Sequence, residues 1–347
     1  MKAIVLKEFG GPEVLRWEDL PAPKLAAGEV LIKVHSVSVN RTLDCIVRAG
    51  KYLVKIQLPH VLGADPAGEV VELGDGVTKF EPGDRVAVIS ATPCQKCAPC
   101  LKDEDFNCVD SKRIGVDRWG GYAELIAVPA RYAMKLPDEI SFVEGTVITR
   151  HFPMAFNLLI SKADVKPGER VLVMGATGAL GSSCVQVAKM LGAKVIAGAG
   201  TDERVELAKS YGADFGVNYR AHDLAKAVMR LTDNQGVDIV CENISDPTLW
   251  PAAFASLAIN GRLVTAGAHG GGTVRLDAKR LYMRRLRIIG AAGTSLSDVE
   301  KALDAARQGK IRAIINRTIP LSNAAEAHRI VEQNQIAGKL ILDPTQD

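Results

Sequence analysis

The sequence predicts a two-domain α/β protein in which a β-rich N-terminal half is followed by a doubly wound parallel sheet. The chain has 347 residues, and at about 150 residues per domain this length favours two domains. Up to about residue 83, short β-branched segments such as 29–34 and 67–73 are separated by Gly and Pro, which is typical of strands. Beyond about residue 161, apolar segments alternate with helical patterns such as 182–191 and 203–211, which indicates a parallel sheet with crossover helices.

The composition narrows the classes of function. With 47% hydrophobic and 24% charged residues, the chain has the composition of a folded protein. The net charge of +3 includes no long block of like charges, so the sequence provides no electrostatic surface for nucleic acid or an anionic membrane. The apolar run at residues 1–6 is too short for a signal peptide, and no apolar stretch reaches the ~18 residues of a membrane span. We therefore expect a soluble cytoplasmic protein that acts on a small molecule.

Six candidate strands in the second region make one complete dinucleotide-binding sheet. They are residues 170–174, 194–199, 215–218, 238–242, 262–266 and 287–291. The tail that follows contains an amphipathic helix and a final apolar strand at residues 339–342. The apolar positions of that helix are Val299, Ala302, Leu303 and Ala306.

A glycine-rich turn directly follows the first strand of this sheet and leads into a helix of small and apolar residues. Residues 175–181 have the spacing G-x-x-G-x-x-G. Glycine at these positions permits a tight turn and a close approach of the backbone to a pyrophosphate, which the N–H groups of the helix N-terminus bind. A purely structural turn is the alternative, but strand, turn, helix and next strand stand in the order that dinucleotide binding requires. The candidate cofactor-binding residues are Gly175, Thr177, Gly178, Ala179, Leu180 and Gly181.

The end of the second strand favours NADP over NAD. An enzyme that prefers NAD usually has Asp or Glu there to accept the ribose hydroxyl groups, whereas this chain has Ala199. In the alternative interpretation, Asp202 caps the following helix and Arg204 is a solvated helix residue. The residues that suit a 2′-phosphate are Gly200, Thr201 and Arg204, with Tyr219 or Arg220 after the third strand.

Four of the seven cysteines lie within fifteen residues, in the spacing C-x2-C-x2-C-x7-C. In a reducing compartment, clustered thiols are more often metal ligands than disulfides. Four thiolates close a tetrahedral zinc site and leave no position for water or substrate, so such a site stabilises a loop. An iron–sulfur cluster and a plain loop of reduced thiols are the alternatives. The metal-ligand candidates are Cys94, Cys97, Cys100 and Cys108.

Residues 39–44, 48–52, 62–68 and the 175–181 turn resemble the quinone oxidoreductase branch of the medium-chain dehydrogenase/reductase superfamily. The resemblance covers essentially the whole chain, although the cysteine lobe at 94–108 is more typical of zinc-containing alcohol dehydrogenases. It implies a GroES-like catalytic domain of residues 1–150 completed by 293–347, and a Rossmann NADP-binding domain of residues 151–292, with the active site in the cleft. It also implies a homodimer, and residues 286–292 are compatible with edge pairing across a two-fold axis.

The resemblance implies one zinc ion per chain, in a structural role only. Members with a catalytic zinc bind it through a Cys, a His and a further Cys or Asp, and the corresponding positions here are Asn40, Ala64 and about Arg150. Amide, methyl and guanidinium groups cannot replace thiolate and imidazole as zinc ligands. His60 is close in sequence, but a single His before a strand is more often a packed or capping residue.

Without a metal, hydrogen bonds must polarise the substrate, and hydride transfer from NADPH depends on positioning. The resemblance points to Asn40 and Asp44, in the region of the missing zinc site, and to Tyr52, whose hydroxyl group can hydrogen-bond a substrate oxygen or supply a proton. Alternatively, Asp44 forms a salt bridge with Arg41 or Arg48, and Tyr52 packs within its loop.

Arg150 and His151 stand where relatives have an apolar segment, close to the expected nicotinamide site. We hypothesise that Arg150 recognises an acidic group of the substrate and that His151 relays a proton. Alternatively, Arg150 pairs with Glu144 and His151 caps a helix.

Further cofactor contacts follow from the ends of the later strands, because ligands of an open parallel sheet lie at the carboxyl ends of its strands. The candidates are Asn243 after the fourth strand, Gly267 and Ala268 after the fifth, and Ala291 after the sixth.

The function that the resemblance implies is NADPH-dependent reduction of a quinone or an α,β-unsaturated carbonyl by hydride transfer, without a catalytic zinc. One alternative is an aldehyde/alcohol or enoyl-thioester oxidoreductase. The other is a non-catalytic NADPH-binding protein, against which stand the polar residues Asn40, Asp44 and Tyr52.

Overall fold

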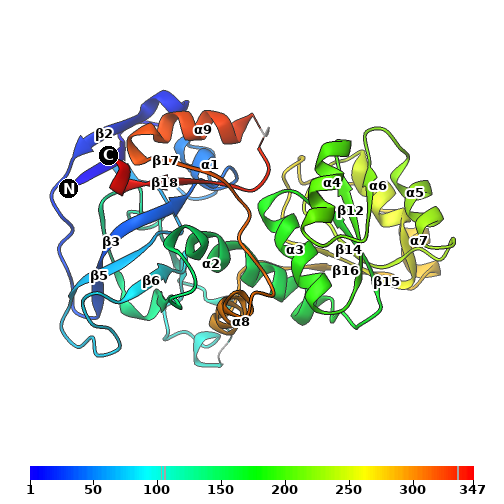
Figure 1. The fold of residues 1–347 in the computed structure, drawn as a ribbon, viewed down its shortest axis with the longest axis horizontal. Helices are drawn as coiled ribbons and strands as arrows, with labels where there is room; N and C mark the ends of the chain where they lie inside the picture. Colours follow the sequence, from blue (N-terminus) through cyan, green and yellow to red (C-terminus); the bar gives the residue numbers. More distant parts are fainter. Residues whose placement is uncertain (103, 105–106, 334–335) are drawn as a thin grey trace. The chain divides into compact units, whose positions relative to one another are not determined.

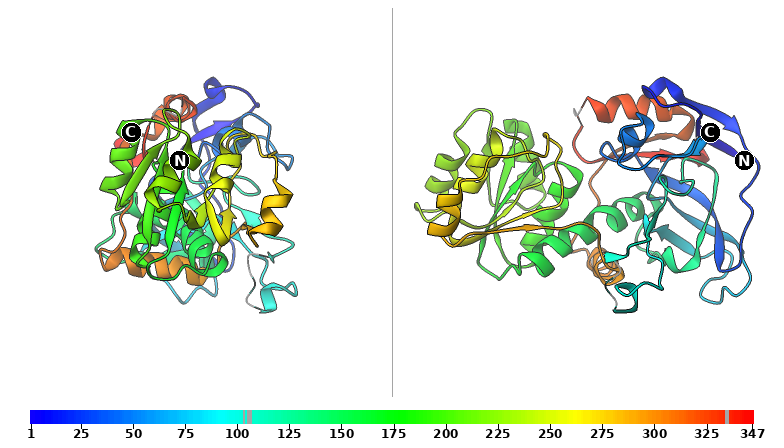
Figure 2. Two further views of the ribbon diagram at one scale, coloured as in Figure 1. Left: turned by 90° about the vertical axis from the view of Figure 1, so that its right-hand side faces the viewer. Right: turned by 180° about the vertical axis from the view of Figure 1, so that it is seen from behind.

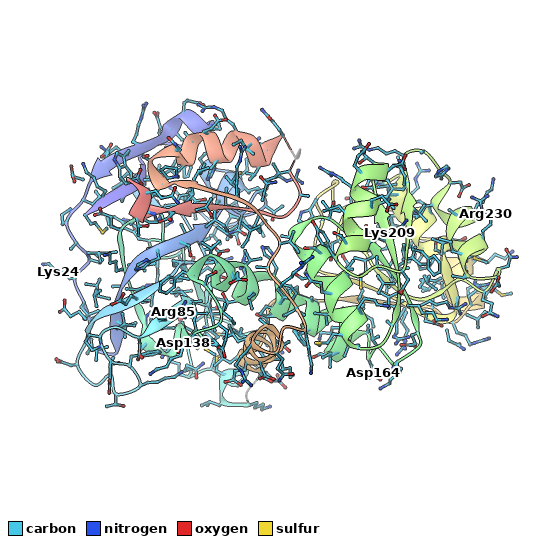
Figure 3. All side chains as sticks on the ribbon, viewed as in Figure 1. Lys24, Arg85, Asp138, Asp164, Lys209 and Arg230 are labelled. Carbon is cyan, nitrogen blue, oxygen red and sulfur yellow. The ribbon has the colours of Figure 1, made fainter. Side chains whose placement is uncertain are left out.

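The computed structural model describes residues 1–102, 104, 107–333 and 336–347, which form two compact units (Figure 1). The first unit comprises residues 1–150 and 312–347, and the second comprises residues 151–311. Charged side chains project from both, as Lys24 and Asp138 of the first unit and Lys209 and Arg230 of the second show in Figure 3. In the described part of the chain, no helix is both long enough and apolar enough to cross a membrane.

A seven-stranded sheet forms the centre of the first unit, in the order β10-β6-β5-β3-β18-β17 with β9 paired to β3. Two smaller sheets, β2-β1-β4 and β7-β8, accompany it. The strands are β1 (Lys2–Leu6), β2 (Leu15–Asp19), β3 (Glu29–Ser38), β4 (His60–Val61), β5 (Ala67–Leu73), β6 (Arg85–Val88), β7 (Ala91–Thr92), β8 (Lys112–Arg113), β9 (Leu125–Pro129), β10 (Ala133–Lys135), β17 (Ile315–Pro320) and β18 (Lys339–Asp343). The helices are α1 (Asp44–Arg48), α9 (Ala324–Glu332) and α2 (Phe142–Phe156), which continues past the unit boundary.

The C-terminal tail completes the sheet of the first unit. Strand β18 pairs antiparallel with β3, with Ile341 opposite Ser38, and Figures 1 and 2 show the red β18 close to the blue β3. As a result, Lys339 at the start of β18 contacts Val39 and Asn40, which follow β3 in the sequence.

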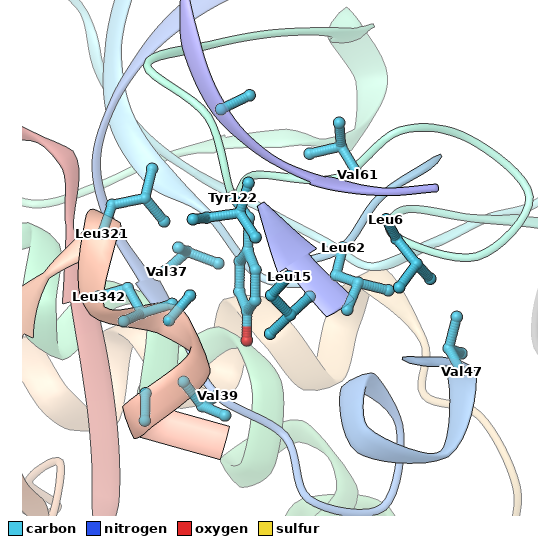
Figure 4. Packing of buried hydrophobic residues seen from close by; sticks show 14 of the residues in the cluster. Leu6, Leu15, Val37, Val39, Val47, Val61, Leu62, Tyr122, Leu321 and Leu342 are labelled. Carbon is cyan, nitrogen blue, oxygen red and sulfur yellow. The ribbon is translucent and has the colours of Figure 1, made fainter. Parts of the chain in front are cut away.

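The ring of Tyr122 lies in the main hydrophobic cluster of the first unit and is fully buried. Leu6 of β1, Val61 of β4 and Leu342 of β18 belong to the same cluster. Figure 4 shows the ring among these aliphatic side chains, with its hydroxyl oxygen at the end away from the backbone. Apolar packing therefore holds one polar atom of Tyr122 at a defined point inside the unit.

The second unit is a six-stranded parallel sheet in the order β13-β12-β11-β14-β15-β16, which is the Rossmann order 3-2-1-4-5-6. Its strands are β11 (Arg170–Met174), β12 (Lys194–Ala199), β13 (Phe215–Asn218), β14 (Val237–Cys241), β15 (Leu257–Thr265) and β16 (Arg287–Gly290). Its helices are α3 (Ala179–Met190), α4 (Asp202–Ser210), α5 (Leu224–Leu231), α6 (Leu249–Ala255), α7 (Ala278–Met283) and α8 (Leu296–Arg307). The predicted order of a β-rich unit followed by a doubly wound parallel sheet is confirmed.

Two details differ from the sequence prediction. The chain returns to the first unit at residue 312 instead of 293, because α8 follows β16 after a short connection and groups with the second unit. The N-terminal half also contains α1, at residues 44–48. A helix of that length is too short to show helical periodicity in a sequence.

Candidate functional site

The four cysteines of the lobe come together as the spacing predicts. The sulfur atoms of Cys94, Cys97, Cys100 and Cys108 all lie within 4.8 Å of one another, and Cys97 Sγ lies 3.4 Å from Cys100 Sγ and 3.8 Å from Cys108 Sγ. A zinc ion with bonds of about 2.3 Å to four tetrahedral sulfurs places those sulfurs about 3.8 Å apart. The donor set therefore fits a closed zinc site.

Backbone N–H groups hydrogen-bond two sulfur atoms of this lobe. The N–H groups of Cys100 and Val109 hydrogen-bond the Cys97 sulfur and hold the pKa of its thiol at about 6, and the N–H of Cys94 donates to Cys108 Sγ at 3.1 Å. Thiolates are the form that binds metal. At its start, the lobe is anchored to the body of the unit, because Arg131 donates to the carbonyl of Pro93 at 3.2 Å and Tyr132 donates to the same oxygen.

Asn40 is the residue that the resemblance aligns with a metal-binding Cys, and in the structure its side chain points inward. Its Oδ1 accepts a hydrogen bond from Lys339 Nζ at 2.8 Å, and its Nδ2 donates to Asp65 Oδ2 at 3.1 Å. Asp65 also accepts from the backbone N–H of Ser38 at 3.0 Å and from its hydroxyl group at 2.6 Å. Because Asn40 is only 5% exposed and both ends of its amide are bonded, it is placed to position other groups.

Asp44 is fully buried and belongs to the same network. Its Oδ2 accepts from the backbone N–H of Asn40 at 2.7 Å and from Tyr122 Oη at 3.3 Å, whereas its Oδ1 has no hydrogen-bond partner among the described residues. Burial raises the pKa of this carboxyl to about 6, and the charge of Asp65 adds to the rise. Asp44 forms neither of the alternative salt bridges, with Arg41 or with Arg48, among the ion pairs of the described residues, and Arg48 pairs with Glu332 at 2.5 Å.

Tyr52 packs against Arg113. The guanidinium carbon lies 5.3 Å from the centre of the Tyr52 ring, and Nη1 donates to the Tyr52 hydroxyl oxygen at 2.9 Å. Because an arginine only donates, the proton of the Tyr52 hydroxyl stays available to an acceptor. The ring is thus packed within its surroundings, as the alternative interpretation describes. The hydroxyl proton can still be donated to a substrate oxygen.

Arg150 does not pair with Glu144, which instead accepts from the Ser141 hydroxyl group at 2.7 Å. Arg150 donates to the Ser90 hydroxyl oxygen at 2.5 Å and remains partly exposed. Its charge acts on Asp44 and on Lys339. His151 is partly exposed and is the first residue of the second unit.

His60 is packed, as expected. It is 4% exposed, and burial lowers its pKa.

The glycine turn has the geometry that a pyrophosphate site requires. Gly175 has φ = +64°, and a Cβ at Gly181 would lie 2.1 Å from the carbonyl oxygen of Gly175, so no other residue fits there. Gly178 is the N-cap of α3 and offers no side chain to its first-turn N–H groups. These groups are therefore left for an anion.

The residues proposed to bind a 2′-phosphate lie after β12, in the first turn of α4 and directly after β13. A Cβ at Gly200 would lie 3.3 Å from Arg220 Nε and 3.4 Å from Tyr219 Oη, and the charges of Arg220 and Arg204 act on Tyr219. Thr201 is the N-cap of α4, since its side chain accepts from the backbone N–H of Arg204 at 3.3 Å. The interpretation of Asp202 as the capping residue is thus wrong.

Asp202 instead accepts a hydrogen bond from Asn218 Nδ2 at 2.9 Å. Its carboxylate is therefore engaged with the end of β13.

The ends of β14 and β15 meet at Asn243. Its Oδ1 accepts from the backbone N–H of Ala266 at 3.3 Å, and the residue is 5% exposed, yet its Nδ2 has no hydrogen-bond partner among the described residues. A buried donor in this state costs free energy unless a ligand accepts its hydrogen bond. The neighbouring candidates Gly267, Ala268 and Ala291 offer backbone and small side chains at the same edge of the sheet.

Comparison with known proteins identifies the family. Two family models match, the alcohol dehydrogenase GroES-like domain over residues 26–138 and the zinc-binding dehydrogenase over residues 179–308. The NAD-dependent alcohol dehydrogenase of Sulfolobus acidocaldarius is 33% identical over 352 residues, covering 99% of this chain and 100% of the relative. The quinone oxidoreductase of Homo sapiens is 31% identical over 350 residues, covering 99% and 97%. A crystal structure of an NAD-dependent alcohol dehydrogenase superposes with a TM-score of 0.93 at 35% identity, covering 99% of each chain.

A GroES-like unit and a Rossmann unit with a glycine turn define an oxidoreductase that uses a pyridine nucleotide. The chain belongs to the medium-chain dehydrogenase/reductase superfamily, as the resemblance implied.

Several functional candidates are evident only in the structure. Lys339, Asp65, Tyr122 and His328 complete the buried network around Asn40 and Asp44. In the second unit, the fully buried Glu242 accepts from the backbone N–H groups of Ile244 and Ser245 and shapes the loop beside Asn243. Lys339 directly precedes the apolar run 340–342, and no local signal distinguishes it from an exposed lysine at the start of a strand.

Proposed function

We propose that the protein is an NADPH-dependent reductase of quinones or α,β-unsaturated carbonyls that works without a catalytic metal. The main support for this proposal is the hydrogen bond that the side-chain oxygen of Asn40 accepts from the Lys339 ammonium group. Ala64 and Arg150 occupy the other two positions at which the resemblance implies zinc ligands. Amide, methyl and guanidinium groups leave no ligand set for zinc. Soft, conjugated acceptors suit a site that polarises its substrate only through hydrogen bonds.

The residues of the second unit fit a phosphorylated dinucleotide. The turn 175–181 and the uncapped start of α3 would hold the pyrophosphate, and Arg220 with Tyr219 and Arg204 would hold a 2′-phosphate. When bound, NADPH supplies the hydride. A carboxylate at the end of β12 would repel the 2′-phosphate, but Ala199 stands there.

Residues of the first unit supply hydrogen bonds and a proton. Arg150, held by Ser90, can donate to the carbonyl oxygen of the substrate or to an acidic group on it. Tyr52 keeps its hydroxyl proton available while Arg113 holds its oxygen. We assign to Tyr52 the proton that the reduced substrate takes up, and to the four-cysteine lobe one structural zinc ion.

NAD-dependent oxidation of an alcohol is the second candidate, and it is favoured by the names of several relatives, which are alcohol dehydrogenases. Initial rates separate the two functions. We expect faster oxidation of NADPH than of NADH with 9,10-phenanthrenequinone or a simple enone, and little reduction of NAD⁺ with primary or secondary alcohols. The opposite pattern would support the second candidate, and cofactor binding without turnover would indicate a non-catalytic protein.

We also propose a homodimer that forms through β16. In the described part of the second unit, this strand pairs only with β15, and it exposes Ile288. An unpaired edge strand with an exposed apolar side chain is suited to pairing with a second copy across a two-fold axis.

A further inference from the structure

Lys339 places an ammonium group inside the first unit. The residue is 5% exposed, and its Nζ donates to the carbonyl oxygen of Val39 at 2.7 Å and to Asn40 Oδ1 at 2.8 Å. Desolvating an ammonium group is costly, whereas an apolar side chain of similar volume would pack there without that cost. Burial of a cation at this position therefore calls for a role other than packing.

The ammonium group is the centre of a balanced set of charges. Asp44 and Asp65 attract it, and Arg150 repels it. The two acids and Lys339 are buried, whereas Arg150 is partly exposed. Among the described residues, further ionisable groups pack around this set: Cys45 acts on Lys339, Tyr122 hydrogen-bonds Asp44, and His328 contacts both Cys45 and Tyr122.

The hydrogen bonds of Lys339 also set the orientation of Asn40. Because an ammonium group only donates, the atom of Asn40 that faces Lys339 must be the amide oxygen, and the NH₂ group must face Asp65. Asn40 in turn holds Asp44 through its backbone N–H. Loss of the positive charge at Lys339 would thus loosen the segment that carries both candidate residues.

We propose that protonated Lys339 is a positioning residue for hydride transfer, holding Asn40 and the 40–44 segment in the arrangement that the reaction requires and supplying the positive charge that balances Asp44 and Asp65. This inference rests on the proposed reductase function and deepens it. Lys339 acts through Asn40 and does not itself touch the substrate.

Deprotonation of Lys339 should slow the reaction at alkaline pH. Burial lowers the pKa of Lys339 to about 8, although the acids Asp65 and Asp44 oppose that shift. Above this pH the amine becomes neutral and no longer balances the two acids, while the charge of Arg150 still acts on Asp44. We therefore expect kcat to fall on the alkaline side with an apparent pKa of about 8.

Stability should change in the opposite direction over the same range. The pKa of Lys339 is lower in the folded protein than its ordinary value of 10.5, so between pH 8 and 10.5 the unfolded chain binds a proton that the folded chain does not. The contribution of Lys339 to the free energy of unfolding then rises with pH. A fall in kcat accompanied by this rise cannot come from unfolding.

The test compares pH profiles of kcat and KM for reduction of 9,10-phenanthrenequinone by NADPH. We expect Lys339→Met to lower kcat about 10- to 100-fold at pH 7 and to leave KM for NADPH unchanged. Lys339→Arg should restore most of kcat and remove the alkaline fall, because the guanidinium group stays charged. As a matched control, Lys135→Met removes an exposed lysine of the same unit that pairs with Asp84, and its profile should match the wild type.

A second variant keeps the proposal testable if substitutions at Lys339 prevent folding. Asp65→Asn removes a carboxylate that raises the pKa of Lys339, so the alkaline fall should move to lower pH. An alkaline profile that stays unchanged in both Lys339→Arg and Asp65→Asn, with turnover intact, overturns the positioning role and leaves the reductase function standing. Absence of turnover by the wild type with every acceptor overturns both.

The melting temperature supplies a readout that does not depend on turnover. Relative to Lys339→Met, the wild type should gain stability as the pH rises from 8 to 10.5. If the difference in melting temperature between the two proteins does not change with pH, Lys339 is not the buried cation that the proposal requires.

Discussion

The hydroxyl group of Tyr122 lies 3.2 Å from Nε2 of His328, a residue 206 positions further along the chain. Arg48 Nη1 lies 3.1 Å from the other ring nitrogen, Nδ1. Because arginine only donates, Nδ1 accepts and Nε2 carries the proton, which it donates to Tyr122. Tyr122 then donates to Asp44. This chain of hydrogen bonds joins His328 of α9 to the candidate residue Asp44 at the start of α1.

His328 should make the protein sensitive to acid. Burial and the nearby Arg48 charge lower the pKa of His328 to about 3. The unfolded chain therefore binds a proton between about pH 6.5 and 3 that the folded chain does not, and stability is lost as the pH falls through this window, by at most about 1.4 kcal/mol per pH unit. Urea unfolding at several pH values should show a weaker acid loss in His328→Gln than in the wild type. If the free energy of unfolding depends on pH equally in both proteins, the lowered pKa of His328 is contradicted.

Asp44 opposes this effect, since its raised pKa of about 6 makes the folded protein bind a proton between pH 6 and 3.8. For this reason the informative quantity is the difference between wild type and His328→Gln at each pH.

Substitution of Cys97 should remove the metal without abolishing the chemistry. We expect Cys97→Ser to lose about one zinc ion per chain and to melt at a lower temperature, because four thiolates close a structural site. Metal analysis and thermal unfolding measure both effects, and kcat of the fraction that stays folded should change little. Cys184→Ala, in the second unit, is the control that keeps its zinc. Visible absorbance from bound iron would instead support the iron–sulfur alternative.

Arg220 should determine much of the preference for NADPH. Loss of a charge-assisted hydrogen bond to the 2′-phosphate costs about 1.5–3 kcal/mol, so Arg220→Ala should raise KM for NADPH about 10- to 100-fold. KM for NADH, which lacks that phosphate, should stay the same. Arg230→Ala, at an exposed position on α5, is the matched control. A parallel rise for both cofactors would show that Arg220 acts elsewhere than at the 2′-position.

Asn243 should donate to the bound cofactor through its unpartnered Nδ2. Asn243→Asp keeps an oxygen for the N–H of Ala266 and replaces the NH₂ donor with an acceptor. We expect the dissociation constant for NADPH, measured by fluorescence titration, to rise about tenfold or more, since a hydrogen bond is lost and a repulsive contact replaces it. Unchanged affinity with an unchanged melting temperature would refute this role.

Ile288 should be required for dimer formation. Ile288→Glu places a charge on the exposed edge strand β16, where two copies would bury it against each other. Light scattering should report a dimer for the wild type and a monomer for the variant. The exposed Leu53 of the first unit provides the control substitution Leu53→Glu, which should leave the dimer intact.

The sequence by itself determined the elements whose signals are local. The first three strands of the Rossmann sheet have the predicted bounds, because the first two are mainly apolar runs followed by glycine and the third is a short segment between two helical patterns. Cys94 to Cys108 lie so close in the sequence that their spacing alone indicates a metal site.

Only the tertiary structure decided which polar groups face inward. Lys339 reaches Asn40 across 299 positions, and His328 reaches Arg48 across 280. Neither pair has a periodicity or spacing that a sequence could display. The position of α8 in the second unit, and the burial of Asn40 and Asp44, likewise depend on packing between distant segments. Local patterns specify elements, whereas burial and charge balance arise only when the tail returns to pair with β3.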